Sequence, residues 1–302
     1  MAQRGRHCRF GTAQLHVLIG GRSLSFVTTP GTAVLDLRRD SYTHAVERVE
    51  QALRVKLQQD SFVVKRRTVG ARSDRGTWVR IEVQPADVFG TRGWGGIASS
   101  VQLLGVSRPS WLCSFDWFEG RFRWRADETE LISARPVSER ACVDAVPVLP
   151  KAWWETFNRS LDALRWHFPD HSATRHTALL TQRRITRLIT SMFGEVDTVV
   201  PEWCAVHGDL SWANLTAPEC VFLDWEDWGR GPVGFDAASL WALSLPVPEL
   251  ADRITIERAS DLATRSGRIS WLYQCAGLLD TETDPVFTEP ARRQAARLLA
   301  EW

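Results

Sequence analysis

The segment that decides the fold reads Val206-His207-Gly208-Asp209-Leu210-Ser211-Trp212-Ala213-Asn214, followed by Val221-Phe222-Leu223-Asp224-Trp225-Glu226. Apolar runs precede both aspartates: Trp203–Val206 leads to the first and Cys220–Leu223 to the second. Short apolar runs are typical of buried strands, which can deliver a polar side chain at their end. Asp209, Asn214 and Asp224 thus supply two carboxylates and one neutral amide oxygen, the ligand type that Mg²⁺ prefers.

Phosphoryl transfer is the chemistry that these groups fit. It needs one carboxylate to orient the attacking hydroxyl and accept its proton, and a second to hold magnesium against the nucleotide phosphates. An asparagine completes the metal shell without adding negative charge. In a kinase catalytic loop the base and this asparagine are five residues apart, as Asp209 and Asn214 are here. The alternative is that Asp209 caps a helix and Asp224 ends a strand, which leaves the spacing to coincidence.

The same residues resemble the aminoglycoside phosphotransferase and choline kinase family, relatives of the protein kinases. Its members carry H-G-D-x-x-x-x-N, an apolar strand, D-[WF]-E and a downstream G-P-x-x-x-D. Here these elements are His207-Gly208-Asp209, Asn214, Asp224-Trp225-Glu226, Gly231-Pro232 and Asp236. The resemblance implies a magnesium-dependent enzyme that transfers the γ-phosphate of ATP or GTP to the hydroxyl group of a small molecule.

The resemblance also implies a role for each matching residue. Asp209 is expected to be the catalytic base, and Asn214 and Asp224 are expected to bind Mg²⁺. His207 is expected to support the catalytic loop through packing and hydrogen bonding, and Asp236 to brace it.

A kinase also needs a cation on the strand before the first helix of the small lobe. Arg80, in the strand-like run Thr77–Val83, is the preferred phosphate contact, and Lys65 is the alternative. A salt bridge without phosphate contact is the third possibility for both. The partner glutamate expected in the following helix is absent from Gly95-Gly96-Ile97-Ala98. Gly70–Gly76, rich in arginine and backbone donors, is a candidate for the loop that covers the phosphates.

The order of the predicted elements indicates an α+β protein with two lobes, as in the protein kinases. We predict a small β-rich lobe over residues 1–132, with an N-terminal extension of about residues 1–40, and a larger helical lobe over residues 133–302. Residues near Thr129–Ile132 are expected to form the hinge. In the small lobe we expect a helix from Asp40, a hairpin of Ser61–Thr68 and Thr77–Val83, a helix over Ile97–Leu104, and a hairpin of Trp111–Phe118 and Arg121–Ala126. In the large lobe, apolar residues at helical spacing predict helices near residues 153–164, 185–192, 236–245, 250–265, 269–279 and 290–301.

Possible substrate contacts lie beside the catalytic segment. The rings of Trp212, Trp225 and Trp228 could stack on a sugar, a planar base or a cation, although core packing is the commoner use of tryptophan. The acidic side chains of Glu226 and Asp227 could favour a cationic substrate.

Charge is distributed unevenly along the chain, although the net charge is only +1. Residues 1–125 carry +10 and residues 126–302 carry −9, which fits one lobe that binds polyphosphate and another that binds a metal or a cationic substrate. Solvated faces that happen to segregate are the alternative. We expect no nucleic-acid partner and no membrane span, since neither a contiguous basic stripe nor a long apolar window occurs. Six scattered cysteines and no signal-peptide pattern predict a cytoplasmic protein, as a monomer or a homodimer.

An antibiotic-modifying resistance phosphotransferase is the preferred function. It follows from the resemblance and from the arginine-rich composition, with only three lysines among 37 basic residues, which is typical of GC-rich antibiotic producers. A metabolic kinase of choline, homoserine or a sugar is one alternative, and a non-catalytic nucleotide-binding module is another. A protein kinase is disfavoured, because the interval from Asp224 to Asp236 leaves no room for an activation loop.

Overall fold

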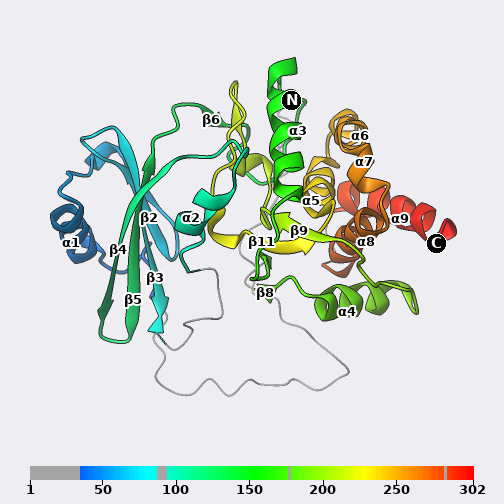
Figure 1. Cartoon of the computed structure of the whole chain (residues 1–302), viewed down its shortest axis with the longest axis horizontal. Coiled ribbons are helices and arrows are strands. Elements are labelled where there is room, and N and C mark those ends of the chain that lie inside the picture. The colour runs from blue at the N-terminus through cyan, green and yellow to red at the C-terminus, as the bar shows by residue number, and fades with distance from the viewer. Residues whose placement is uncertain (1–34, 87–93, 176–177, 282–283) are drawn as a thin grey trace, which may run out of the picture.

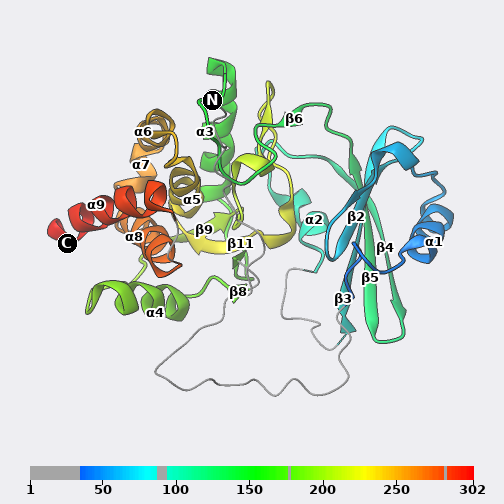
Figure 2. The ribbon, with the colours of Figure 1, turned by 180° about the vertical axis from the view of Figure 1, so that it is seen from behind.

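The computed structural model describes residues 35–86, 94–175, 178–281 and 284–302. Most of the predicted N-terminal extension therefore lies outside the described residues. The described chain forms a twisted sheet with a helix on its outer side, next to a larger part that holds most of the helices (Figure 1). The view from behind shows the same two parts side by side (Figure 2). The predicted α+β class, with a β-rich lobe followed by a helical lobe, is confirmed; the exact boundary at residue 132 stays a prediction.

The small lobe is built on a five-stranded antiparallel sheet in the order β1-β2-β3-β5-β4. Its strands are β1 (Val63–Val64), β2 (Thr68–Arg72), β3 (Thr77–Pro85), β4 (Trp111–Glu119) and β5 (Phe122–Glu130). The predicted hairpin between β4 and β5 is confirmed, and it turns at Gly120 with a φ of 57°. The first predicted hairpin is displaced, because most of Ser61–Thr68 lies outside strands. Residues 69–72, expected in the turn between the two predicted strands, belong to strand β2.

The alternation along β3 gives the sheet two different faces. Val79, Ile81 and Val83 are at most 2% exposed and belong to the small-lobe core. Helix α1 (Thr43–Leu53) adds Ala45, Val46 and Val49 to the same core, so it covers this face of the sheet. Since successive side chains of a strand point to opposite faces, Arg80 and Glu82 lie on the other face.

Helix α2 (Gly96–Ser99) lies between the sheet and the large lobe in both views (Figures 1 and 2). A 3₁₀ turn over Ser100–Gln102 follows it, so the regular helix is shorter than the predicted Ile97–Leu104. Gly96 marks the closest approach to the large lobe: a Cβ added there would lie 2.5 Å from the backbone oxygen of Glu226.

The large lobe is helical with short strand pairs. Its helices are α3 (Lys151–Arg165), α4 (Gln182–Phe193), α5 (Phe235–Ser244), α6 (Pro248–Glu257), α7 (Ala259–Leu262), α8 (Arg265–Asp280) and α9 (Pro285–Ala300). Its strands are β6 (Arg135–Pro136), β7 (Thr174–Arg175), β8 (Ala178–Leu179), β9 (Trp203–Val206), β10 (Thr216–Ala217) and β11 (Gly229–Pro232). All the predicted large-lobe helices are present, except that the helix predicted over residues 250–265 is divided into α6 and α7.

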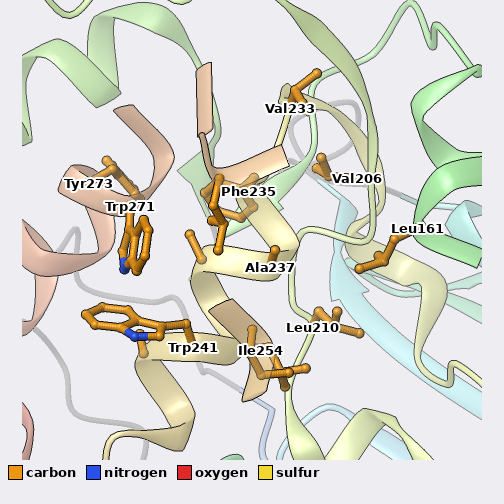
Figure 3. Packing of buried hydrophobic residues seen from close by; sticks show 14 of the residues in the cluster. Leu161, Val206, Leu210, Val233, Phe235, Ala237, Trp241, Ile254, Trp271 and Tyr273 are labelled. Carbon is orange, nitrogen blue, oxygen red and sulfur yellow. The ribbon is translucent and has the colours of Figure 1, made fainter. Parts of the chain in front are cut away.

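The core of the large lobe forms around α5, whose residues are almost all buried. Figure 3 shows Trp241 of α5 facing Trp271 of α8; their ring centroids are 5.2 Å apart in an edge-to-face arrangement. Edge-to-face pairs of this kind add to the stabilisation from burial alone. Val206 and Leu210 lie on either side of the loop His207-Gly208-Asp209 and belong to the same core. Both ends of this loop are therefore fixed by buried side chains.

No helix of the described residues is long and apolar enough to cross a membrane. The cysteines in the described part of the chain are free thiols: Cys113, Cys142, Cys204, Cys220 and Cys275.

Candidate active site

The loop His207-Gly208-Asp209 leaves the end of β9, which pairs antiparallel with β11. Asp236, in the first turn of α5, lies beneath this loop and is 4% exposed. Its carboxylate accepts the backbone N–H of His207 at 2.7 Å and that of Gly208 at 3.1 Å. Because hydrogen bonds to a charged acceptor are stronger than neutral ones, Asp236 fixes the path of the chain just before Asp209.

Gly208 is required by the shape of this loop. Its φ is +84°, a left-handed value that side chains rarely adopt. A Cβ at this position would lie 2.7 Å from the backbone oxygen of Asp227 and 3.1 Å from that of Thr174. The segments before and after the loop therefore pack directly against its backbone.

His207 is fully buried and connects the loop to the strand that leads to Asp224. Its Nε2 donates a hydrogen bond to the backbone oxygen of Leu223 at 2.7 Å, and its ring centroid lies 4.7 Å from that of Trp225. These contacts hold the two halves of the motif at a fixed separation.

Asn214 ends a 3₁₀ turn over Trp212–Asn214 and reaches back to the loop. Its Nδ2 donates to the backbone oxygen of Asp209 at 2.8 Å, and its own backbone oxygen accepts from Leu223 N at 2.8 Å. The structure thus brings Asp209, Asn214 and the residue before Asp224 together. With Nδ2 committed to Asp209, the orientation of the Asn214 side-chain amide is set.

Asp224 has a left-handed backbone conformation, with φ 64° and ψ 59°. A non-glycine residue in this region is uncommon and marks a position that the surrounding structure enforces. Burial would raise the pKa of its carboxyl, but the charges of Arg80 and Lys65 lower that pKa to about 2. The carboxylate of Asp224 is therefore ionised at neutral pH, as an oxygen ligand for Mg²⁺ would need to be.

Arg80 and Lys65 both reach Asp224 from the small lobe. Lys65 Nζ lies 3.7 Å from Asp224 Oδ2, and Arg80 Nε lies 3.9 Å from Oδ1. Lys65 stands in the turn between β1 and β2, closed by a hydrogen bond from its N–H to the oxygen of Thr68 at 2.8 Å. Lys65 thus brings this turn close to Asp224, the candidate metal ligand. The segment Gly70–Gly76, predicted to cover the phosphates, consists of the end of strand β2 and the turn that leads to β3.

Asn214 and Asp224 fit a magnesium ion by their donor chemistry. Mg²⁺ keeps several waters and is bound by one or two protein ligands together with substrate phosphates. A larger set is not required, and groups of three or more His, Cys, Asp or Glu able to hold a metal do not occur among the described residues. An ionised carboxylate and an oriented amide are the expected contribution of the chain.

The three tryptophans considered as substrate contacts lie in the core instead. Trp212, Trp225 and Trp228 are at most 3% exposed, so their ring faces are covered by protein. Trp212 Nε1 donates to Ser244 Oγ and Trp225 Nε1 to the oxygen of Phe222. Their abundance next to the motif reflects packing around the loop rather than substrate stacking.

Trp228 has a further structural effect. Its Nε1 donates to the backbone oxygen of Gly96 at 2.8 Å and lies 3.1 Å from Ser99 Oγ. Helix α2 of the small lobe is therefore attached to the segment that follows Asp224.

Glu226 and Asp227 are both partly exposed next to Asp224. Burial, together with the charges of Asp209 and Asp224, raises the pKa of Asp227 to about 7. Burial also raises the pKa of Glu226, so the site brings together several acidic groups that oppose one another's ionisation.

Glu82 is a site residue that the sequence reasoning missed. Its Oε2 lies 2.8 Å from Arg80 Nη1, while Arg80 Nη2 lies 2.7 Å from Glu226 Oε1. The partner glutamate is expected in the helix after the strand, but the structure pairs Arg80 with Glu82 on the strand itself. The signal that could have found Glu82 is the spacing Arg80-x-Glu82, which places both side chains on one face of β3.

A five-stranded antiparallel sheet beside a helical lobe that presents this loop defines a protein-kinase-like fold. Residues 138–268 match the sequence model of the Phosphotransferase enzyme family. This match contains every motif quoted for the resemblance, so the predicted resemblance to this family is confirmed. The match also confirms the predicted enzyme class, a phosphotransferase that acts on a hydroxyl group.

Solved structures of aminoglycoside phosphotransferases share this fold. The GDP complex of wild-type aminoglycoside 2'-phosphotransferase-IIIa aligns with a TM-score of 0.54 and 12% identity over 87% of this chain and 99% of that chain. A thermostable mutant of APH(4)-Ia in a ternary complex with AMP-PNP and hygromycin B aligns with a TM-score of 0.52 and 13% identity over 85% and 95% of the two chains. The GDP and kanamycin complex of APH(2")-IIia aligns with a TM-score of 0.52 and 12% identity over 86% of this chain and 99% of that chain. Identities this low show a common fold alone, and no curated protein sequence matches the chain.

Proposed function

We propose that the protein is an antibiotic-modifying O-phosphotransferase that transfers the γ-phosphate of ATP or GTP to a hydroxyl group of its substrate. The observation that carries this proposal is the placement of Asp209, Asn214 and Asp224. Asn214 bonds to the backbone of Asp209 and its oxygen is bonded by the residue before Asp224. These residues supply a base and two metal ligands within one short stretch of structure.

In the proposed mechanism Asp209 orients the substrate hydroxyl and accepts its proton as the oxygen attacks the γ-phosphorus. The new bond joins the substrate oxygen to phosphorus, and the bond to the bridging β-γ oxygen breaks, which releases the nucleoside diphosphate. Asn214 and Asp224 would hold Mg²⁺, which when bound neutralises charge on the phosphates. Arg80 and Lys65 contribute further positive charge from the small lobe.

His207 and Asp236 contribute by position. Asp236 holds the backbone before Asp209, and His207 ties the loop to the strand of Asp224. A base held in this way needs little reorganisation when the substrate arrives.

The substrate in this proposal is a cationic, amino-bearing alcohol. Asp209, Asp224, Glu226 and Asp227 bring four acidic groups together at the site. Burial and the neighbouring carboxylates raise the pKa of Glu226 and of Asp227, so a cationic substrate group bound beside them would favour their ionised forms. Two proteins of the same fold are described as complexes with kanamycin and with hygromycin B, which is consistent with a substrate of this kind. Because ATP and GTP are the donors, the reaction is proposed to take place in the cytoplasm.

A nucleotide-consumption assay tests the proposal. The protein and Mg²⁺ are incubated with ATP or GTP and a panel of amino-bearing antibiotics, with choline, homoserine and simple sugars as comparison. We expect turnover with an antibiotic and a fall of roughly 10²–10⁴-fold in Asp209→Asn. Asp252→Asn, at an exposed position of α6, is the matched control and should keep full activity. Turnover with choline, homoserine or a sugar alone would make the protein a metabolic kinase, and full activity in Asp209→Asn would contradict the assignment of the base.

A further inference from the structure

The guanidinium of Arg80 is surrounded by carboxylates on all its nitrogens. Nη1 lies 2.8 Å from Glu82 Oε2, Nη2 lies 2.7 Å from Glu226 Oε1, and Nε lies 3.9 Å from Asp224 Oδ1. The side chain is only 14% exposed. Arginine has a planar fork of donors, so a partner at each edge fixes its direction more completely than one partner can fix a lysine.

Helix α2 cannot supply the carboxylate that usually orients such a cation. Residues 96–102, which form the helix and the 3₁₀ turn after it, contain no acidic side chain. At Gly96 an added Cβ would lie 2.5 Å from the oxygen of Glu226 and 2.7 Å from that of Trp225, so backbone packs on backbone. The helix is bonded in this position by Trp228 and has no room there for a longer side chain.

Glu82 stands where it can take over this role. Residues two apart on a strand share a face, so Glu82 travels with Arg80 on β3, while Glu226 belongs to the other lobe. The second oxygen of Glu82 accepts a hydrogen bond from Gln84 Nε2 at 2.7 Å, and Gln84 is 8% exposed. Arg80, Glu82 and Gln84 thus form a continuous hydrogen-bonded row along one face of the strand.

Glu82 is charged in this row. Burial would raise the pKa of its carboxyl, but Arg80 and Gln84 together lower that pKa below its ordinary value. The bond to Arg80 is therefore an ion pair at neutral pH. It can persist when a nucleotide phosphate takes the place of Glu226 at Nη2, because the two nitrogens bond to different partners.

We infer that Glu82 is the positioning residue that aims Arg80 at the nucleotide phosphates, in place of a helix glutamate. This inference rests on the proposed function, since it requires a nucleotide triphosphate at Arg80. Its consequence is that the orientation of the phosphate-binding cation is built into one strand. Movement of α2 is then not needed to complete the nucleotide site.

Calorimetric titration with Mg²⁺ and non-hydrolysable ATP and GTP analogues tests the inference, with adenosine and guanosine as ligands that lack phosphate. Glu82→Gln should weaken triphosphate binding about ten- to hundredfold, the range for losing a hydrogen bond to a charged group. Nucleoside binding should not change, whereas a merely structural defect would weaken both. Glu47→Gln, at an exposed position of α1, is the matched control.

A double-mutant cycle isolates the pair. In the Arg80→Met background, Glu82→Gln should have no further effect on triphosphate affinity, because its only route of action has been removed. Gln84→Leu, which frees one oxygen of Glu82 and keeps the carboxylate, should weaken binding less and should also depend on Arg80; it serves if Glu82→Gln does not fold.

Two results would overturn the inference: unchanged triphosphate affinity in Glu82→Gln, or an equal loss with and without Arg80. A wild-type protein that binds neither triphosphate analogue would overturn the proposed function itself, and the inference with it.

Discussion

The carboxylate of Asp236 accepts the backbone N–H of His207 at 2.7 Å, although 29 residues separate them in the sequence. Its other oxygen accepts the N–H of Gly208, so both oxygens of one buried carboxylate are used on consecutive residues. The loop and helix α5 are therefore joined by charge-assisted bonds between buried groups. A loop that must present Asp209 accurately is attached in this way to the most buried helix of the large lobe.

Asp236→Asn tests this attachment. An amide offers one acceptor oxygen where the carboxylate offers two, so one backbone N–H would face an NH₂ group. We expect a loss of about 1–3 kcal/mol in the free energy of unfolding, the cost of a buried unsatisfied donor, and a fall in turnover. Chemical denaturation followed by circular dichroism measures the first, with the exposed Asp252→Asn as control. Equal stability of the two variants would contradict a structural role for the bonds.

The first hairpin shows why part of the small lobe escaped sequence reasoning. Trp111–Ala126 alternates in composition and turns at Glu119-Gly120, so local signals suffice. Gly70 and Ala71 have turn composition but lie buried in strand β2. A Cβ at Gly70 would lie 2.3 Å from the ring of Trp78 on β3. Glycine at position 70 leaves room for the ring of Trp78, which belongs to the neighbouring strand. The local sequence around Gly70 does not reveal this contact.

At the site, too, some residues could be predicted from local sequence patterns and others only from contacts between segments. The spacing from His207 to Asp236 could be read from the sequence because each residue has a fixed chemical task. Glu82 is harder to find: the spacing Arg80-x-Glu82 places it on the same strand face as Arg80, but only the structure shows that it bonds to Arg80 while Glu226 approaches from the other lobe. The tryptophans misled for a related reason: proximity to a motif says nothing about burial, and Trp212, Trp225 and Trp228 face inward.

Asp224→Asn should remove the dependence of nucleotide binding on magnesium. Asparagine tolerates the left-handed backbone that Asp224 adopts, so the loop geometry is expected to persist. What is lost is the charge that, with a pKa of about 2, is present at neutral pH to bind Mg²⁺. Calorimetric titration of ATP or GTP with Mg²⁺ and with EDTA measures the difference. The wild type should bind more tightly with Mg²⁺, and an unchanged difference in the variant would exclude Asp224 as a ligand.

Gly208→Ala should abolish turnover and destabilise the fold, and Gly76→Ala provides a matched comparison. Both glycines have a left-handed φ, +84° and +73°, but only Gly208 has atoms within 4 Å of the added Cβ. The backbone cost of about 1–2 kcal/mol applies to both variants. The contact with Asp227 at 2.7 Å adds to it only at Gly208. Denaturation curves that coincide for the two variants would show that the loop accommodates the added Cβ at Gly208 without a further loss in the free energy of unfolding.

Asp227→Asn should make the protein more stable at alkaline pH. Burial, with the charges of Asp209 and Asp224, raises the pKa of Asp227 from 3.8 to about 7 in the folded protein. The folded state thus binds this proton more tightly than the unfolded state. The resulting stabilisation is complete below about pH 4 and is lost as the pH rises to about 7, because the unfolded chain ionises first.

Asparagine at position 227 does not ionise, so the variant does not lose stability as the pH rises from about 4 to 7. The stability of Asp227→Asn relative to the wild type should increase from about pH 4 to pH 7 and then stay constant. Chemical denaturation across this range, in EDTA so that no metal neutralises the site, measures the difference. Asp252→Asn, at an exposed position, should run parallel to the wild type. A difference for Asp227→Asn that does not vary with pH would mean that its carboxyl titrates normally, and that the carboxylates at this site do not act on one another.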